Sequence, residues 1–329
     1  MKTFTDRRQF LASMAALGAG ALSPAGAWAQ DAYPAKGPIK LIVPLPAGGA
    51  ADASARVLTY ALQNQMKQSF VVDNRPGGSF VIAMQAMAQA AADGYTLMHI
   101  YPGMIAAQVA LKRFDMLKSL TPISLIGSMP AVLVAPASSP YKTVQDLVAA
   151  ARAKPGSVNY GSVGPGTIEH LWSSNFSKRH GLNAVHVPYK GMPDATTALI
   201  TGDIQYLGLA MALTLQFVQK NMVRPLAVID SQRHPSMPDV PTLKEAGFDD
   251  PPLVFWGGVA APKGTPSTIV EKLREQIAVA VASDDVKTKF AGMGTTPLSS
   301  PTVQSFENLV SKELAWLTEA VKDANLQLN

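Results

Sequence analysis

Three turns built from glycine and small polar residues are the parts of this sequence best suited to hold a ligand. They lie at residues 46–52, 76–79 and 161–167, each between a short apolar run and a helical pattern. At such a turn the first backbone N–H groups of the helix have no intrahelical partner, and the helix dipole is positive there. Glycine also lets a ligand approach the backbone closely. Each turn is therefore a candidate anion site without a basic side chain, although a glycine turn can equally serve only to reverse the chain.

Two side chains near these turns could add to an anion site. His170 stands about one helical turn past Thr167, where it either touches an anion or acts as a structural histidine. Lys190 either pairs with a carboxylate or is a solvated surface charge, which is the commoner role of lysine.

Motifs for catalysis, cofactors and metals are missing from the sequence. Neither GxxxxGK[ST] nor GxGxxG occurs, which argues against a nucleotide site. There is no cysteine and no GxSxG motif, and the five histidines include no HExxH motif and no i,i+4 pair. Asp52, Asp194 and Asp203 lack the local spacing of paired acid and base. The sequence predicts a binding protein without cofactor or metal; an enzyme assembled from distant residues is the alternative.

Alternating strand and helix patterns surround the turns. Strands are predicted at 39–44, 70–72, 95–100, 158–160 and 185–187, and helices at 53–66, 82–91, 168–180 and 195–201. Two amphipathic helices are predicted at 267–282 and 301–324, with Ser267 and Ser300 as N-caps and Pro301 at the first helical position. This alternation predicts an α/β fold with parallel sheets covered on both faces.

Two apolar segments interrupted by glycine or proline are predicted to cross between two lobes. They are Pro122–Val134 and Leu253–Val259. Two crossings place both chain ends in one lobe, residues 30–126 and 255–329, and the middle of the chain, residues 127–254, in the other. A ligand cleft between the lobes would then bring the glycine turns of both together.

The N-terminus has the three parts of a secretory signal peptide: a basic start, an apolar run from Phe10 to Leu22, and the small-residue site Ala27–Ala29. The apolar run is shorter than the roughly 20 residues of a membrane span. The sequence predicts export to the periplasm with cleavage near Ala29. The pair Arg7-Arg8 fits the twin-arginine route and the general secretory route alike.

Composition narrows the class of protein further. Removing residues 1–29 deletes Lys2, Arg7, Arg8 and Asp6, which lowers the net charge from +5 to +3. Such a small, scattered positive charge gives no reason to expect a nucleic-acid partner. Hydrophobic residues make up 47% of the chain without a second run of spanning length, so we expect a globular protein that is not embedded in a membrane. No heptads stand out, and a monomer is expected.

The chain resembles the periplasmic substrate-binding proteins of tripartite tricarboxylate transporters, the Bug family, along essentially its whole mature length. The resemblance rests on an ordered series of short motifs rather than on any single one. They include Ile39–Pro46, Gly48–Asp52, Asn74–Gly77, Ala92–Leu97, Leu120–Ser124, Lys154–Tyr160, Gly164–Thr167 with His170-Leu171, Val187–Gly191, Pro225–Val228, Pro238–Thr242, Glu245–Gly247 and Ala261–Pro266.

This resemblance implies a fold of the periplasmic-binding-protein type II kind, with two doubly wound α/β lobes joined by a two-segment hinge. It also implies that turn backbone and bridging waters hold a small organic carboxylate, which the protein passes to a membrane permease. A ligand-sensing subunit of a two-component system is the alternative. The positions implied are Gly48, Gly49, Ala50 and Ala51 in the first turn, Ser79 in the second, and Gly164, Gly166, Thr167 and His170 in the third.

Three departures from the family pattern suggest a more apolar binding pocket. Phe80 stands where glycine and asparagine are usual, Tyr101 replaces a small polar residue, and Gln205 replaces an aspartate that could face an ammonium group. We expect a ligand with a bulky or aromatic body that stacks on these rings, in preference to an amino acid or citrate. In the alternative reading Phe80 and Tyr101 are core residues.

Overall fold

The computed structural model describes residues 33–323, and the predicted signal peptide at 1–29 lies outside them. From Pro38 onward the chain forms one α/β unit. Its larger sheet has the strand order β10 (Thr296–Pro297), β4 (Leu120–Pro136), β9 (Val254–Pro262), β3 (Thr96–Ile100), β1 (Ile39–Val43) and β2 (Phe70–Asn74), with β7 (Leu207–Ala210) and β8 (Val223–Val228) also paired to β4. A smaller sheet pairs β5 (Asn159–Ser162) with β6 (Val185–Pro188) in parallel.

The first part of the chain builds three parallel strands. They are β1 (Ile39–Val43), β2 (Phe70–Asn74) and β3 (Thr96–Ile100), with β1 hydrogen-bonded to both of the others. β1 reads as a continuous apolar run broken only by Lys40, as expected of a strand buried on both faces. All three strands end at the edge where turns to the next helices begin.

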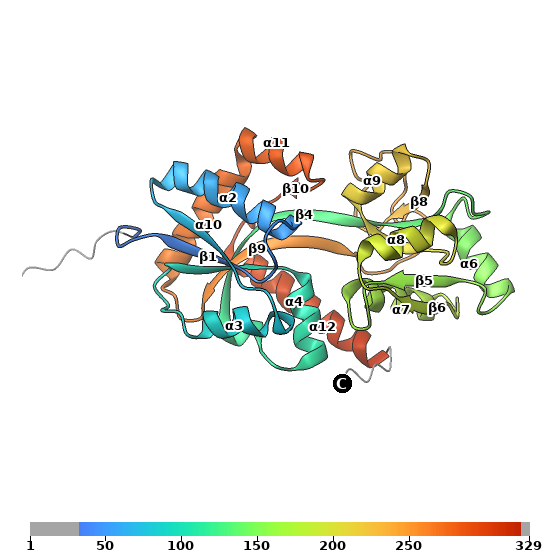
Figure 1. Ribbon diagram of the computed structural model, residues 1–329, viewed down its shortest axis with the longest axis horizontal. Helices are drawn as coiled ribbons and strands as arrows, with labels where there is room; N and C mark the ends of the chain where they lie inside the picture. Colours follow the sequence, from blue (N-terminus) through green and yellow to red (C-terminus); the bar gives the residue numbers. More distant parts are fainter. Residues whose placement is uncertain (1–32, 324–329) are drawn as a thin grey trace, which may run out of the picture. The chain divides into compact units, whose positions relative to one another are not determined.

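Helices cover both faces of this sheet, as Figure 1 shows. α2 (Ala50–Met66), α10 (Ser267–Ala282) and α11 (Asp284–Gly292) lie on one face and pack on one another. α3 (Val81–Ala88), α4 (Pro102–Leu111) and α12 (Val303–Asp323) lie on the other, where α12 packs against α4. The apolar residues of α2 that are buried, Ala55, Leu58 and Leu62, recur at helical spacing and face the sheet.

Strand β4 (Leu120–Pro136) is 17 residues long and changes partners along its length. As far as Pro130 it pairs antiparallel with β9 (Val254–Pro262), and near Gly127 also with β10 (Thr296–Pro297). From Ala131 it pairs with β7 (Leu207–Ala210) and β8 (Val223–Val228). Both predicted crossing segments therefore lie within this ladder, while the lobe boundaries at 126/127 and 254/255 stay a prediction.

The middle of the chain adds further helices around β4 and the small sheet. They are α5 (Met116–Ser119), α6 (Val144–Ala153), α7 (Ile168–Arg179), α8 (Met192–Thr201) and α9 (Met211–Gln219). A short 3₁₀ turn, η1 (Gly78–Phe80), precedes α3. In the part of the chain that the structure describes, none of the helices is both long and apolar enough to cross a membrane.

The prediction of parallel sheets holds only for β1–β3 and β5–β6. β4, β7, β8, β9 and β10 join the larger sheet antiparallel. β8 and β9 each run antiparallel to β4 and so run in the same direction as each other, although residues 229–253 between them contain no helix. Apolar periodicity identifies a strand but does not give its direction.

Two predicted helix caps are wrong by one or two residues. Pro266, not Ser267, is the N-cap of α10. Thr302 caps α12, because its Oγ1 accepts the Ser305 N–H at 3.1 Å. Ser300 is instead buried against β4, where its Oγ accepts the Leu125 N–H and its own N–H donates to Ser124 Oγ, both at 3.0 Å. A serine near a helix start is visible in sequence, but its partner is not.

We expect the substitution Gly258→Ala to lower the free energy of unfolding by about 2 kcal/mol. A methyl group at Gly258 in β9 would enter the space of the buried Phe306 ring and lie 3.0 Å from the Ser124 carbonyl oxygen. Urea denaturation followed by circular dichroism measures the effect. Gly292→Ala is the control, because nothing lies within 4 Å of a methyl group there. Equal stability of the two variants would contradict this packing.

Candidate functional site

The first glycine turn is held by the side chain of Asp52. Gly48 has a φ of 86°, in the left-handed region that favours glycine, and its N–H donates to Asp52 Oδ2 at 2.9 Å. The same oxygen accepts Arg56 Nε at 3.0 Å. The Gly48 amide is thus used within the protein. The amides of Gly49, Ala50 and Ala51, at the start of α2, have no intrahelical acceptor and are the ones open to a ligand.

Asp52 also ties the first turn to the second. Its Oδ1 accepts Asn74 Nδ2 at 3.0 Å, and Asn74 Nδ2 also reaches the Leu45 carbonyl oxygen at 3.1 Å. The hydrogen bond from Arg56 is the largest effect that lowers the pKa of buried Asp52, to about 2. Asp52 is a positioning residue that the sequence suggested only as a possible acid or base.

The second turn brings Phe80 to Tyr101. Ser79 is exposed, and both it and Phe80 have positive φ. The Phe80 ring meets the Tyr101 ring edge-on with centroids 5.5 Å apart, and both rings pack partly buried against the core. The Tyr101 hydroxyl is buried, and no described residue hydrogen-bonds to it. Each ring is therefore partly buried against the core and partly exposed.

The third turn is closed by its own side chains. Gly164 N–H donates to Ser162 Oγ, and Gly166 N–H donates to His170 Nδ1, both at 3.1 Å. Thr167 Oγ1 donates to the Gly164 carbonyl oxygen at 2.8 Å. As at Gly48, the glycine amides shape the turn. At the start of α7 the Glu169 N–H is hydrogen-bonded to its own buried carboxyl group, so the amides of Ile168 and His170 are the ones without an acceptor in the helix.

Two histidine rings contact each other behind this turn in a tilted arrangement. The ring centroids of His170 and His186 are 3.9 Å apart, and Ser162 Oγ lies 2.7 Å from His186 Nε2. Burial lowers the pKa of both imidazoles, that of His186 to about 4 with a contribution from His170. Both rings are therefore neutral near pH 7. His170 supports the turn rather than supplying a cation, and His186 was missed because strand residues carry no local signal of such a contact.

Gln205 is hydrogen-bonded within its own loop, and Lys190 is exposed. Gln205 Oε1 accepts the Asn159 N–H at 2.7 Å and its Nε2 donates to the Gly202 carbonyl oxygen at 2.8 Å. The amide side chain therefore closes its own loop. Lys190 is exposed in the turn before α8.

Contacts connect the elements that carry the three glycine turns. Asp52 joins the first and second turns, η1 packs on α4, and α4 packs on α7. That the turns at Gly49 and Gly166 converge on a single ligand stays a prediction.

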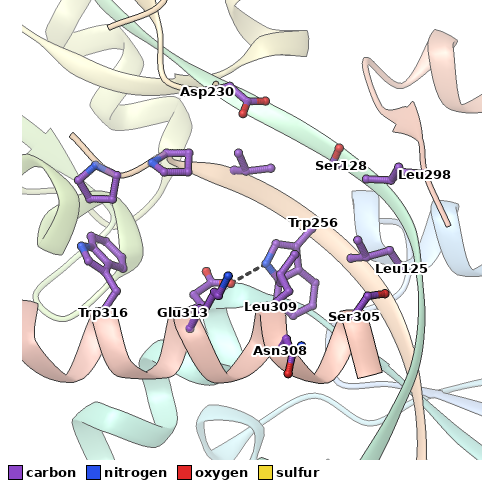
Figure 2. Close-up of a pocket in the computed structure, with 14 residues that line it drawn as sticks. Leu125, Ser128, Asp230, Trp256, Leu298, Ser305, Asn308, Leu309, Glu313 and Trp316 are labelled. Atoms are coloured by element: carbon purple, nitrogen blue, oxygen red, sulfur yellow. Dashed lines mark hydrogen bonds between the residues drawn. The ribbon is translucent and has the colours of Figure 1, made fainter. Parts of the chain in front are cut away.

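A separate pocket of about 600 Å³ lies between α12 and strands β4 and β9, and Figure 2 shows its lining side chains. None of the thirteen predicted site residues lines it. Trp256 Nε1 donates to Glu313 Oε2 at 2.6 Å inside this pocket. Burial raises the pKa of Glu313 to about 7.

Residues 54–326 match the tripartite tricarboxylate transporter family receptor, TctC. The chain belongs to this receptor family. It is 36% identical to a UPF0065 protein in the tcbD-tcbE intergenic region of Pseudomonas sp. (strain P51), over 85% of this chain and 83% of that protein. It is 33% identical to protein BugT of Bordetella pertussis, over 94% and 95% of the two chains.

Solved structures share the fold of this receptor. A TctC solute-binding protein from Polaromonas superposes with a TM-score of 0.80 at 27% identity, covering 88% of this chain and 99% of that one. The R. palustris protein Rpa4515, solved with adipate, gives 0.72 at 30% identity, covering 89% and 98%. MatC from Rhodopseudomonas palustris, with bound malate, gives 0.70 at 27%, covering 88% and 100%. The predicted two-lobe periplasmic-binding-protein fold is confirmed.

Replacing Asp52 by asparagine should lower the stability of the receptor by about 1–2 kcal/mol at pH 7. The pKa of Asp52 is depressed in the folded state, so its stabilisation is present above about pH 4 and is lost as the pH falls through 2. Thermal denaturation from pH 7 to pH 2 should show the two proteins converging. Asp285→Asn, in an exposed i,i+4 pair with Lys289, is the control with little expected effect. A gap that persists at pH 2 would contradict the assignment.

Replacing Glu313 by glutamine should have the opposite pH dependence. Because the pKa of Glu313 is raised in the folded state, the folded protein binds more protons than the unfolded chain between about pH 4.5 and 7. Ionisation therefore costs stability as the pH rises. We expect E313Q to match the receptor at pH 4 and to exceed it by about 1–2 kcal/mol at pH 8. The control Glu319→Gln, paired with Lys322 on the same helix, should show no such crossover.

Proposed function

We propose that this receptor captures a small organic carboxylate outside the cytoplasmic membrane and delivers it to a tripartite tricarboxylate-type permease. The observation that carries the proposal is the start of α2. There a glycine turn fixed by Asp52 leaves the amides of Gly49, Ala50 and Ala51 open at the positive end of a 17-residue helix. Such an end binds a carboxylate without a basic side chain.

The other predicted residues take distinct roles in this proposal. Gly48, Gly164 and Gly166 shape the turns, because their own amides are already bonded. The start of α7 after Thr167, supported by His170, supplies a second set of amides. Ser79 and Lys190 are exposed and free to approach a ligand as the lobes close.

The ligand is proposed to carry a bulky or aromatic body. The edge-to-face pair of Phe80 and Tyr101 offers apolar surface beside the turns, and the Tyr101 hydroxyl is an unused hydrogen-bonding group. Gln205 is bonded within its own loop and so provides no counter-charge for the ammonium group of an amino acid. Malate and adipate, found with the two neighbours, are the reference acids against which aromatic acids are compared.

The location follows from the same proposal. Members of this family act as periplasmic receptors, so residues 1–29 are proposed to direct export and to be removed near Ala29. Delivery to a permease then takes place at the outer face of the inner membrane.

Ala51→Asp tests the carboxylate site directly. An aspartate at the second position of α2 favours the helix dipole but repels a ligand anion. We expect unchanged or slightly higher thermal stability, together with a loss of carboxylate affinity of about 100-fold or more. Calorimetric titration with a panel of malate, adipate, citrate, glutamate and aromatic acids measures the affinity.

The control is Thr268→Asp, the same position of α10, which should bind as the unmodified receptor does. Mass spectrometry of ligand retained by freshly purified protein identifies the natural acid. The site assignment fails if A51D binds the acids with unchanged affinity, and the aromatic preference fails if glutamate or citrate binds tightly while aromatic acids do not.

A further inference from the structure

The pocket between α12 and strands β4 and β9 has the properties of a binding site separate from the glycine turns. Its volume of about 600 Å³ falls within the roughly 300–1,000 Å³ typical of small-molecule sites. Its lining combines apolar and aromatic side chains, Trp256 and Trp316 among them, with a few polar ones such as Asp230, Lys312 and Glu313.

Two indole rings give the pocket its flat walls. Trp256 projects from β9 towards α12, and its ring orientation is fixed by the Nε1 hydrogen bond to Glu313 and by an edge-on contact with Phe306 at 5.4 Å. Trp316 lies farther along α12, towards one end of the lining in Figure 2. Indole faces attract cations more strongly than other aromatic side chains do.

The acidic groups of the pocket lie on opposite sides. Glu313 lies on α12, and Asp230 lies across the pocket from it, as Figure 2 shows. Among the described residues no ion pair joins either carboxyl group to a basic side chain. Lys312 also lines the pocket, but it is exposed, and it precedes Glu313 on the helix, so the two side chains do not face each other.

A partly buried carboxyl group without a counter-charge favours its neutral form, and a bound cation would reverse that preference. The raised pKa of Glu313 agrees with this account of its surroundings. An anion or a second carboxylate would instead add like charge beside Glu313 and Asp230.

We propose that this pocket binds a small organic amine, with its ammonium group at Glu313 and its apolar body between Trp256 and Trp316. The site is independent of the proposed carboxylate site, since the two share no residue. It would allow the receptor to respond to a second class of solute.

Calorimetric titration of the mature chain with 2-phenylethylammonium at pH 7.5 tests the proposal. The neutral analogue 2-phenylethanol is the matched ligand control. We expect the amine to bind at least about tenfold more tightly than the alcohol, because a charge-assisted hydrogen bond is stronger than a neutral one. Trp316→Leu, which keeps an apolar wall, should weaken amine binding about threefold to tenfold through the lost stacking of the ligand's phenyl ring on the indole.

Glu313→Gln is the decisive variant. Glutamine retains an oxygen acceptor for Trp256 Nε1 but cannot pair with the ammonium group. We expect amine affinity to fall by at least about tenfold in E313Q, with carboxylate affinity unchanged. In A51D the reverse is expected: amine binding persists and carboxylate binding is lost. The opposite results expected for E313Q and A51D distinguish a failure of the amine-site proposal from a failure of the proposed carboxylate function.

The pH profile supplies a readout that altered packing alone would not produce. Amine affinity should rise from pH 6 to pH 8 as Glu313 ionises, because a primary ammonium stays charged over that range. Of the elements packed against α12, β4 and α4 carry no charged residue, and the charged residues of α7 and α10 do not line the pocket. Asp230 and Lys312 are the other charged lining groups.

Three results would each overturn the proposal. They are the absence of binding heat with millimolar amine, equal affinity for amine and alcohol, and unchanged amine affinity in E313Q.

Discussion

Strand β4 must satisfy its backbone hydrogen bonds along 17 residues, and no single neighbour is long enough to do so. β9 pairs with its first part, and β7 and β8 take over after Pro130. β4 therefore pairs at one end with β9, which belongs to the sheet of β1–β3, and at the other end with β7 and β8, which lie near β5 and α7 in the chain. Because unpaired buried amides are costly, this exchange of partners keeps β4 hydrogen-bonded along its length. The pocket beside Glu313 lies against the same ladder, so its walls depend on the packing of α12 on β4 and β9.

In the glycine turns, some backbone amides stabilise the turn and others are left to bind a ligand. In each of two turns, side chains of the following helix or the preceding strand occupy glycine N–H groups: Asp52 at Gly48, and Ser162 and His170 at Gly164 and Gly166. At the start of α2 the amides that follow, those of Gly49, Ala50 and Ala51, have no such acceptor within the helix. Internal hydrogen bonds thus hold the turn rigid, so that the open amides need little ordering when a carboxylate arrives.

Local sequence patterns gave the strand–turn–helix units well, since apolar periodicity and glycine turns depend on neighbouring residues. α10 was predicted at its observed bounds, and α7 within one residue. The three candidate turns also follow from local composition. The partners that fix them do not. Asn74 lies 22 residues from Asp52, and His186 lies 24 from Ser162, and no local spacing predicts either contact. The hydrogen bond between Gln205 and Asn159 is a further contact that no local spacing predicts, and a ligand contact of Gln205 stays a prediction.

The α/β class, the positions of the glycine turns and the family could all be predicted from residue type and short-range order. Strand direction, the burial of Ser300 against Leu125, and the contact of Trp256 with Glu313 across 57 residues became known from the fold alone. Burial and pairing are set by which segments meet in space, and local sequence does not specify that. The same glutamate on an exposed face of α12 would keep its charge, whereas against β9 it becomes a carboxyl group with its pKa near neutrality.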